Sequence, residues 1–263
     1  MSIADIYANP QNDVYNVKTH ASGPKGSLPL TGDMHFDLPA LQAAARDFDG
    51  HTVFYLCNPN NPTATITPAA QLDAWIKAAP AGQFFILDEA YAEFVSDPAF
   101  VSGIDWIKAG RSNLAVTRTF SKLYALAGLR VGYAIADAET INACEAFMAL
   151  DNTNLAGAVA ALASLRDSDF QQRSRASIDR ARQIVIATLD ELGLRHVPSH
   201  ANFIFHEVGG EVKTYQERMK AEHIIVGREF PPAVGWSRLT LGTPEEMTIF
   251  AAALRSFRTR GWV

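Results

Sequence analysis

Polar side chains in an unusual combination follow three apolar segments of this sequence. The three groups, in chain order, are Asn58, Asn60 and Asn61; then Asp88, Glu89 and Tyr91; then Arg118, Thr119, Ser121 and Lys122, with Arg130 further on. They offer an amine, carboxylates, a phenol and guanidinium groups, which are the groups that proton transfer and anion binding use. No single group of this set is specific, so a functional interpretation depends on the combination.

Each of these residues also has a structural explanation when it is taken singly. Asp88 could cap a helix that begins at Glu89, and Thr119 could cap a turn. Lys122 could be a solvated surface lysine. A carboxylate at the end of a buried strand nevertheless needs a cation or several donors, so the functional interpretation requires that the groups converge.

The elements that must position these residues form an α/β pattern. Apolar segments that predict strands cover 53–57, 84–87, 113–117 and 130–135, and helical segments lie near 38–47, 68–78 and 100–109. Continuous apolar strands that alternate with helices indicate a mainly parallel sheet. Because ligands bind beyond the carboxyl ends of such strands, the polar groups lie where a site is expected.

The second half of the chain has a different pattern of expected helices and strands. Ile178, Ala181, Val185 and Leu189 share one stripe of a long amphipathic helix. Strands are expected near 201–206 and 237–241, with a closing helix from Pro244 to about Phe257. We therefore expect two domains, 1–164 and a smaller α+β domain over 165–263.

Composition narrows the class of protein further. The chain has 263 residues, of which 48% are hydrophobic and 19% charged, and its net charge is −5. This balance disfavours nucleic acid or an anionic membrane as the partner. Cys57 and Cys144 provide neither a disulfide framework nor a metal site. We therefore expect no metal, and we expect a reducing, cytoplasmic compartment. No stretch approaches the length of a membrane-spanning helix.

The order of the motifs resembles the fold-type I pyridoxal-phosphate aminotransferases, and within them the histidinol-phosphate aminotransferase branch. The motifs are Asn-Pro-Asn-Asn-Pro-Thr at 58–63, Asp-Glu-Ala-Tyr at 88–91, Thr-Phe-Ser-Lys at 119–122 and Gly-Leu-Arg-Val-Gly at 128–132. The resemblance runs from about Leu28 to the C-terminus. It implies a three-layer, mainly parallel large domain and transamination between an amino acid and a 2-oxo acid.

The resemblance implies a catalytic set of Lys122, Asp88 and Tyr91. Lys122 would bond covalently to the cofactor aldehyde and move the substrate proton, so its amine must be deprotonated. Burial and the cations Arg118 and Arg130 are expected to lower the pKa of that amine. Asp88 would pair with the pyridinium nitrogen.

Further cofactor contacts are implied for the same motifs. Asn61 and Tyr91 would hydrogen-bond the phenolic oxygen of pyridoxal phosphate, and Thr119, Ser121 and Arg130 would hold its phosphate.

The smaller domain is expected to supply the substrate contacts. Arg238, in Ser-Arg-Leu-Thr-Leu-Gly-Thr, resembles the family arginine that binds the substrate α-carboxylate. Asn202 matches a position that lines the same cleft. Arg228 matches one that faces the distal end of the substrate, which permits an acidic or phosphorylated donor such as histidinol phosphate. Asn154 is explained better as a helix cap.

The sequence also departs from the family pattern. Position 64 is Ala where the family usually has Gly. About a hundred N-terminal residues of full-length members, including amides that bind the phosphate, have no counterpart here. Tyr7 is either a remnant of the aromatic that stacks on the cofactor ring or a loop tyrosine. Where the missing strand would lie, we expect a sheet edge or an exposed apolar face, unless the rest of the chain refolds or a partner covers it.

Three functions therefore stay open at the level of the sequence. The first is a homodimeric aminotransferase, because family members build each site at a subunit interface. The second is a decarboxylase or lyase of the same fold. The third is a catalytically silent member that keeps the motifs without a working phosphate site.

Overall fold

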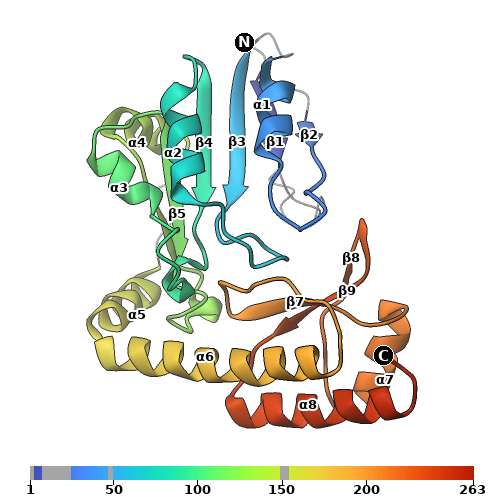
Figure 1. The fold of residues 1–263 in the computed structure, drawn as a ribbon. Helices are drawn as coiled ribbons and strands as arrows, with labels where there is room; N and C mark the ends of the chain where they lie inside the picture. The colour runs from blue at the N-terminus through green and yellow to red at the C-terminus, as the bar shows by residue number, and fades with distance from the viewer. Residues whose placement is uncertain (1–2, 8–24, 47–49, 149–153) are drawn as a thin grey trace.

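The computed structural model describes residues 3–7, 25–46, 50–148 and 154–263, with only the backbone described for 3–7 and 25–27. Figure 1 shows a large sheet with its helices above a long helix, α6 (Ser168–Glu191), and a second, smaller sheet beside it. The two sheets have separate hydrophobic cores. The expected fold class, a mainly parallel α/β domain with a smaller α+β domain, is confirmed.

The large sheet has the strand order β2-β1-β3-β4-β5-β6. Its strands are β1 (Ile3–Tyr7), β2 (Lys25–Ser27), β3 (His51–Cys57), β4 (Gln83–Asp88), β5 (Leu114–Thr119) and β6 (Gly132–Ile135). All pairs are parallel except β5 and β6, which are antiparallel. The four strands expected from the apolar segments are present, whereas β1 and β2 were not predicted from the sequence. Within the described residues, β2 and β6 are the edge strands.

One face of this sheet is closely packed against helices. Its buried side chains come from alternate strand positions and contact α1 (Leu38–Arg46), α2 (Ala69–Ala78) and α3 (Gly103–Lys108). Phe54 and Phe85 stack with their ring centroids 5.0 Å apart, and Trp75 of α2 meets both rings edge-on. On the opposite face, side chains such as Ile86 are only half-buried.

Short elements connect the large sheet to the smaller domain. They are the 3₁₀ turns η1 (Ala92–Phe94) and η2 (Ala127–Leu129) and the helices α4 (Ala138–Glu145) and α5 (Leu155–Arg166). Asn154 caps α5 by accepting a hydrogen bond from the Gly157 amide, which confirms its interpretation as a cap. The domain boundary that we place near residue 165 falls at the carboxyl end of α5 and stays a prediction.

The smaller domain is an antiparallel sheet of order β7-β9-β8 covered by helices. Its elements are α6, β7 (Phe203–Glu207), α7 (Val212–Ala221), β8 (Glu229–Phe230), β9 (Ala233–Thr240) and α8 (Pro244–Thr259). Ala181, Val185 and Leu189 of α6 are fully buried in its core, as the stripe predicted. Thr243 and Glu246 form a capping box that begins α8.

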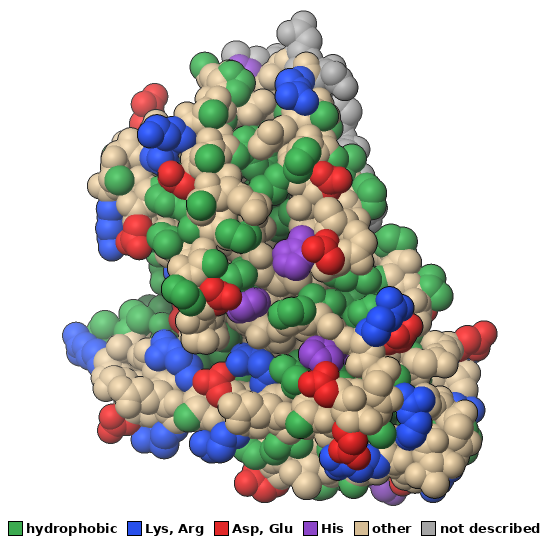
Figure 2. Space-filling view, in the orientation of Figure 1, with side chains coloured by type: hydrophobic (Ala, Val, Ile, Leu, Met, Phe, Trp, Pro, Cys, Tyr) green, Lys and Arg blue, Asp and Glu red, His purple; other side chains and the backbone are tan. Residues whose placement is uncertain are grey.

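The surface carries both signs of charge. Figure 2 shows basic and acidic side chains intermingled over α6, α7 and α8 on the side that it displays, with no extended patch of one sign. Among the described segments, no helix is both long and apolar enough to span a membrane.

Candidate active site

Asp88 lies at the carboxyl end of β4, beside the end of β3. Its backbone carbonyl accepts a hydrogen bond of 2.9 Å from the Asn58 amide. One carboxylate oxygen accepts from the Ala90 amide at 3.0 Å, and the other accepts from the Tyr55 hydroxyl. None of the ion pairs found among the described residues involves Asp88. The carboxylate is therefore held by neutral donors, which leaves its charge available to a cationic ligand.

Lys122 follows β5, the next strand of the sheet, and its amine lies 5.0 Å from the centre of the Tyr91 ring. Burial lowers the pKa of this amine, Arg238 and Arg130 lower it further, and Asp88 opposes them. The expected direction of the shift is therefore confirmed, but one expected cause is wrong. Arg118 is not among the groups that shift this pKa, because its guanidinium pairs with Glu89 on the other face of the sheet.

Tyr91 lies between the two domains with its side chain buried. Burial, opposed by Arg238 and assisted by Cys57 and Asp88, raises the pKa of its hydroxyl to about 12. Its ring packs edge-on against Phe203 of β7, with the centroids 5.0 Å apart. Tyr91 is therefore a neutral phenol at physiological pH and can donate a hydrogen bond.

A hydrogen bond between Arg238 and Asn61 crosses from the smaller domain to the large one. Nη1 of Arg238, on β9, donates to the Asn61 side-chain oxygen at 2.6 Å. The same guanidinium lies over the Phe203 ring at 5.0 Å and near the Phe230 ring at 5.5 Å. Arg238 is thus brought to the site by β9, stacked on aromatic rings that restrict its guanidinium plane.

The residues assigned to the phosphate lie around the turn from β5 to β6. The Thr119 hydroxyl accepts the Ser121 amide at 3.0 Å, which turns the chain toward Lys122. Arg130 is exposed and has a left-handed backbone, with φ at 54°. Its guanidinium donates to the Ala127 carbonyl at 2.7 Å, and its charge acts on Lys122. These three residues therefore lie beside the amine, on an open side of the site.

The remaining predicted residues occupy the smaller domain. Arg228 lies over the Phe230 ring at 4.7 Å, so it shares this ring with Arg238. Asn202 and Lys122 both line a cavity of about 320 Å³ between the β5–β6 turn, α6 and the start of α8. Gly227, next to Arg228, is pressed so closely against β9 that a β-carbon there would lie 2.2 Å from the Arg238 carbonyl oxygen.

Two departures from the family pattern have structural outcomes. Ala64 takes the backbone that the missing glycine would favour, with φ at 62°, and is fully buried. The turn is therefore kept at a cost in strain. Tyr7 ends β1 and so lies in a strand and not in a loop, but its side chain is outside the described residues.

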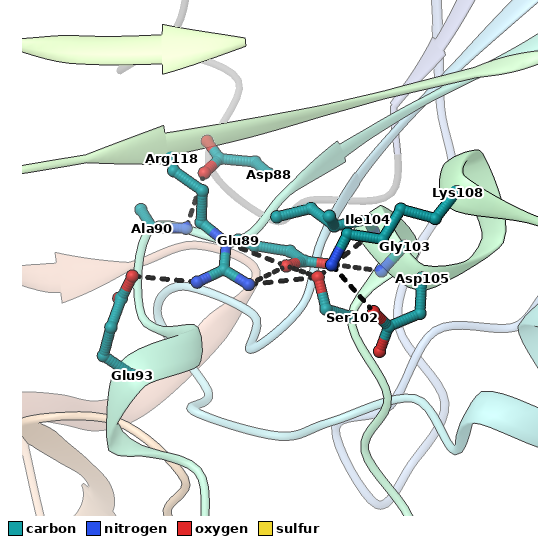
Figure 3. A network of polar contacts seen from close by, with 10 residues as sticks. All are labelled: Asp88, Glu89, Ala90, Glu93, Ser102, Gly103, Ile104, Asp105, Lys108 and Arg118. Carbon is teal, nitrogen blue, oxygen red and sulfur yellow. Dashed lines mark hydrogen bonds and ion pairs between the residues drawn. The ribbon is translucent and has the colours of Figure 1, made fainter. Parts of the chain in front are cut away.

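A buried polar network lies behind the site (Figure 3). Glu89 is 1% exposed, and its carboxylate accepts from the Gly103 amide at 2.7 Å, from the Ser102 hydroxyl at 2.7 Å and from Arg118 at 2.6 Å. Arg118 also contacts Glu93 at 2.8 Å. Burial raises the pKa of Glu89 even though Arg118 and the other donors oppose it.

Sequence reasoning missed two features of the site. Tyr55 was treated only as part of an apolar strand, although strand alternation puts it on the same face as Asp88. The pairing of Glu89 with Arg118 was also missed, although the register of β4 with β5 puts these two residues side by side on the opposite face. No set of three His, Cys, Asp or Glu side chains suited to a metal occurs in the part of the chain that the structure describes.

The fold, with an amine and a carboxylate at neighbouring strand ends, is typical of one family of enzymes. Comparison with known proteins identifies the same family. Residues 13–254 match the family model of aminotransferase class I and II. The chain belongs to this family.

Among curated relatives, the histidinol-phosphate aminotransferase of Moorella thermoacetica is 32% identical over 96% of this chain and 68% of its own length. Histidinol-phosphate aminotransferase 1 of Cupriavidus pinatubonensis is 36% identical over 95% of the chain and 66% of its own length. The chain thus spans about two thirds of the length of these relatives.

Solved structures of similar proteins confirm the fold. The structure of a protein provisionally named histidinol-phosphate aminotransferase, from Erwinia carotovora atroseptica, has a TM-score of 0.95 and 40% identity over 100% of this chain and 76% of that one. The histidinol-phosphate aminotransferase of Sinorhizobium meliloti, solved in complex with pyridoxal-5'-phosphate, has a TM-score of 0.84 and 26% identity over 97% of this chain and 71% of that one.

Proposed function

We propose that this protein binds pyridoxal phosphate and transfers an amino group from a small anionic amine to a 2-oxo acid. One observation carries the proposal: an amine with a lowered pKa, Lys122, and a carboxylate without a cationic partner among the described ion pairs, Asp88, lie at neighbouring strand ends. Family membership and the cofactor in the Sinorhizobium relative support it.

The residues present fit the chemistry of this cofactor. Asp88 would hold a protonated ring nitrogen, since its other partners are neutral donors. Tyr91, a neutral phenol, and Asn61 would bind the phenolic oxygen, and Thr119, Ser121 and Arg130 would bind the phosphate. When bound, pyridoxal phosphate supplies an electron-withdrawing ring that stabilises negative charge at the carbon next to the substrate nitrogen.

Lys122 is the group that can move a proton. Its lowered pKa increases the fraction of neutral amine, which can take a proton from the substrate carbon and later return it. Tyr91, 5.0 Å below the amine, restricts where it can lie. Catalysis by this chain therefore depends on the nitrogen of Lys122 facing the substrate carbon.

Two arginines that share the Phe230 ring support our choice of substrate. Arg238 would bind the anionic group closest to the reacting amine, in place of its present contact with Asn61. Arg228 would face a second polar or anionic group. Histidinol phosphate, from which the relatives are named, is the donor that we propose, with a 2-oxo acid as the acceptor.

The first test is cofactor uptake by the purified chain. We expect a visible absorption band on addition of pyridoxal phosphate, fixed by borohydride reduction on the peptide that contains Lys122. Lys122→Ala should abolish the fixed product. A wild-type chain that stays colourless with excess cofactor would favour the catalytically silent member over both enzymes.

The second test separates the two reactions. Transamination predicts that an amino donor converts the bound cofactor to pyridoxamine phosphate without release of carbon dioxide. Release of carbon dioxide from a carboxylate donor would instead identify a decarboxylase. In a panel of donors, a strong preference for large apolar amino acids over histidinol phosphate would overturn the substrate assignment.

The oligomeric state and compartment are part of the same proposal. We propose a homodimer on the ground of family membership, and a cytoplasmic compartment on the ground of two cysteines that form no disulfide. Sedimentation velocity of the protein with pyridoxal phosphate should give the mass of two chains, and a monomer at all concentrations would contradict this.

A further inference from the structure

Behind the proposed site, a buried ion pair joins the two strand ends from which the site residues project. β4 and β5 pair in parallel up to Asp88 and Thr117, and the last backbone hydrogen bond runs from the Glu89 amide to the Thr117 carbonyl at 3.0 Å. Beyond this bond, β5 turns toward Lys122 and β4 turns toward Tyr91. The ion pair between Glu89 and Arg118 spans the gap, with its closest N–O distance at 2.6 Å.

Strand alternation places this pair and the site residues on opposite faces of the sheet. Asp88 and Thr119 point to one face, and their chain neighbours Glu89 and Arg118 point to the other, toward α3. Figure 3 shows the carboxylates of Asp88 and Glu89 pointing in different directions. A shift of either backbone to relieve the buried pair would therefore move a site residue.

The pair is also anchored on its far side. Ser102 donates to Glu89 at 2.7 Å and accepts from Arg118 at 3.0 Å, and the Gly103 amide at the start of α3 donates to Glu89. Glu93, from η1, contacts Arg118 at 2.8 Å with 8% of its side chain exposed. Buried carboxylates and a guanidinium in such a network have no water to replace a lost partner, so the geometry is rigid.

We infer that Glu89 and Arg118 are positioning residues, which fix the separation between Asp88 and the segment 119–122 and so set the fit of the site to its cofactor. This inference rests on the proposed function for its cofactor readout. Neither residue touches the site itself.

The experiment compares Glu89→Gln and Arg118→Lys with a matched control, Arg111→Lys. Arg111 also pairs with one carboxylate at 2.7 Å and is 23% exposed, but its partner Asp73 lies on α2, away from the site. We expect the two network variants to weaken pyridoxal phosphate binding at least tenfold and to lower kcat at least tenfold, with KM changed less than threefold. The control should stay within twofold of the wild type in all three.

A second readout needs no cofactor. In the cofactor-free protein, hydrogen exchange in peptides covering 88–94 and 117–124 should accelerate at least tenfold in Glu89→Gln and remain unchanged in Arg111→Lys. Unchanged exchange in 117–124 would overturn the inference whether or not the wild type binds cofactor. Failure of the wild type to bind pyridoxal phosphate would instead contradict the proposed function.

A milder variant covers the case in which Glu89→Gln does not fold. Ser102→Ala removes one neutral contact from each member of the pair. We expect it to fold and to weaken cofactor binding about threefold with faster exchange in 117–124. Wild-type values for both in Ser102→Ala would overturn the inference, as would a loss of thermal stability in the network variants with cofactor binding unchanged.

Discussion

Arg238 lowers the pKa of Lys122 and also donates a hydrogen bond to Asn61. The pKa of the Lys122 amine is lowered first by burial and then by the charge of Arg238. Only the neutral amine reacts with an aldehyde, so the rate of covalent uptake of pyridoxal phosphate should rise with pH through this pKa.

Arg238→Leu should therefore shift the pH profile of pyridoxal phosphate uptake to higher pH, because removal of the cation raises the pKa of Lys122. The measurement is the rate of uptake between about pH 6 and pH 10. Arg228→Leu is the matched control, since Arg228 is not among the groups that shift Lys122. A profile that coincides with the wild type, or lies at lower pH, would contradict this prediction.

Part of the arrangement could be predicted from the sequence, and part could not. That Asp88, Tyr91 and Lys122 lie close together could be predicted, because parallel strands place their carboxyl ends at one edge of the sheet. The role of Arg118 was wrong because proximity in sequence to Lys122 does not give the side of the strand, which alternates with each residue. The position of Tyr55 could have been predicted from the same alternation. Tyr55 lies two residues before Cys57, the register partner of Asp88, so Tyr55 and Asp88 lie on the same face of the sheet.

The first residue of helix α3, Gly103, packs closely against side chains of the sheet, and this contact fixes the position of the helix. A β-carbon on Gly103 would lie 2.7 Å from Cδ1 of Leu87 and 2.8 Å from Cγ2 of Val116. The Gly103 amide also donates to Glu89. The absence of a side chain at 103 therefore lets α3 reach both the core and the polar network.

Gly103→Ala should lower the free energy of unfolding by about 1–3 kcal/mol, because the added methyl group overpacks a closed core. Urea unfolding monitored by far-ultraviolet circular dichroism would measure it. Gly128→Ala is the control, since a β-carbon there meets no atom within 4 Å. Equal stabilities of the two variants would refute the argument.

β7 carries a fully buried histidine into the core of the smaller domain. His206 lies edge-on to Tyr215 and Phe250, and burial lowers its pKa to about 4. As the pH falls below about 6.5, the unfolded chain takes up a proton at His206 while the folded chain does not. The folded state therefore loses stability between about pH 6.5 and pH 4.

This loss should amount to about 3 kcal/mol at most. His206→Asn should flatten the decline of unfolding free energy over this pH range, as measured by urea titrations at several pH values. His223→Asn, a change at an exposed histidine, should leave the slope as in the wild type. A slope in His206→Asn equal to that of the wild type would show that other groups cause the pH dependence.

The strands and helices were predicted well where apolar runs are continuous, and poorly where they are not. The apolar runs before Asp88 and before Arg118 gave β4 and β5 within two residues, since a parallel strand must be buried. β1 and β2 are short and flanked by Asn and Pro, so their pairing with the sheet is set by tertiary contacts that no local pattern contains.

On the scale of the whole molecule, a few hydrogen bonds join the two domains beside the site. Arg175 of α6 donates to the Glu93 carbonyl of η1 at 2.8 Å, and the His200 amide donates to the Ala64 carbonyl at 2.9 Å. With the contact of Arg238 and Asn61, these bonds set the distance between Arg238 and the strand ends of the large sheet.

Arg175→Ala should loosen this coupling by about 1 kcal/mol, the net value of one hydrogen bond. We expect KM for the amino donor to rise about fivefold with pyridoxal phosphate affinity unchanged. Arg182→Ala is the control, because Arg182 also lies on α6 but donates to Ala201 inside the smaller domain. A loss of cofactor affinity in Arg175→Ala would place its effect within the cofactor site instead.

The close approach of Gly227 to β9 limits how this protein could be redesigned for other donors. Because the backbone of Gly227 lies so close to Arg238, the separation between the Cα atoms of Arg228 and Arg238 is fixed. A library that varies the side chain at 228 would change the group presented there and keep this separation. Any side chain at 227 would push residues 228 and 238 apart. Acceptance of a longer donor should therefore come from residues around Phe230 and not from position 227.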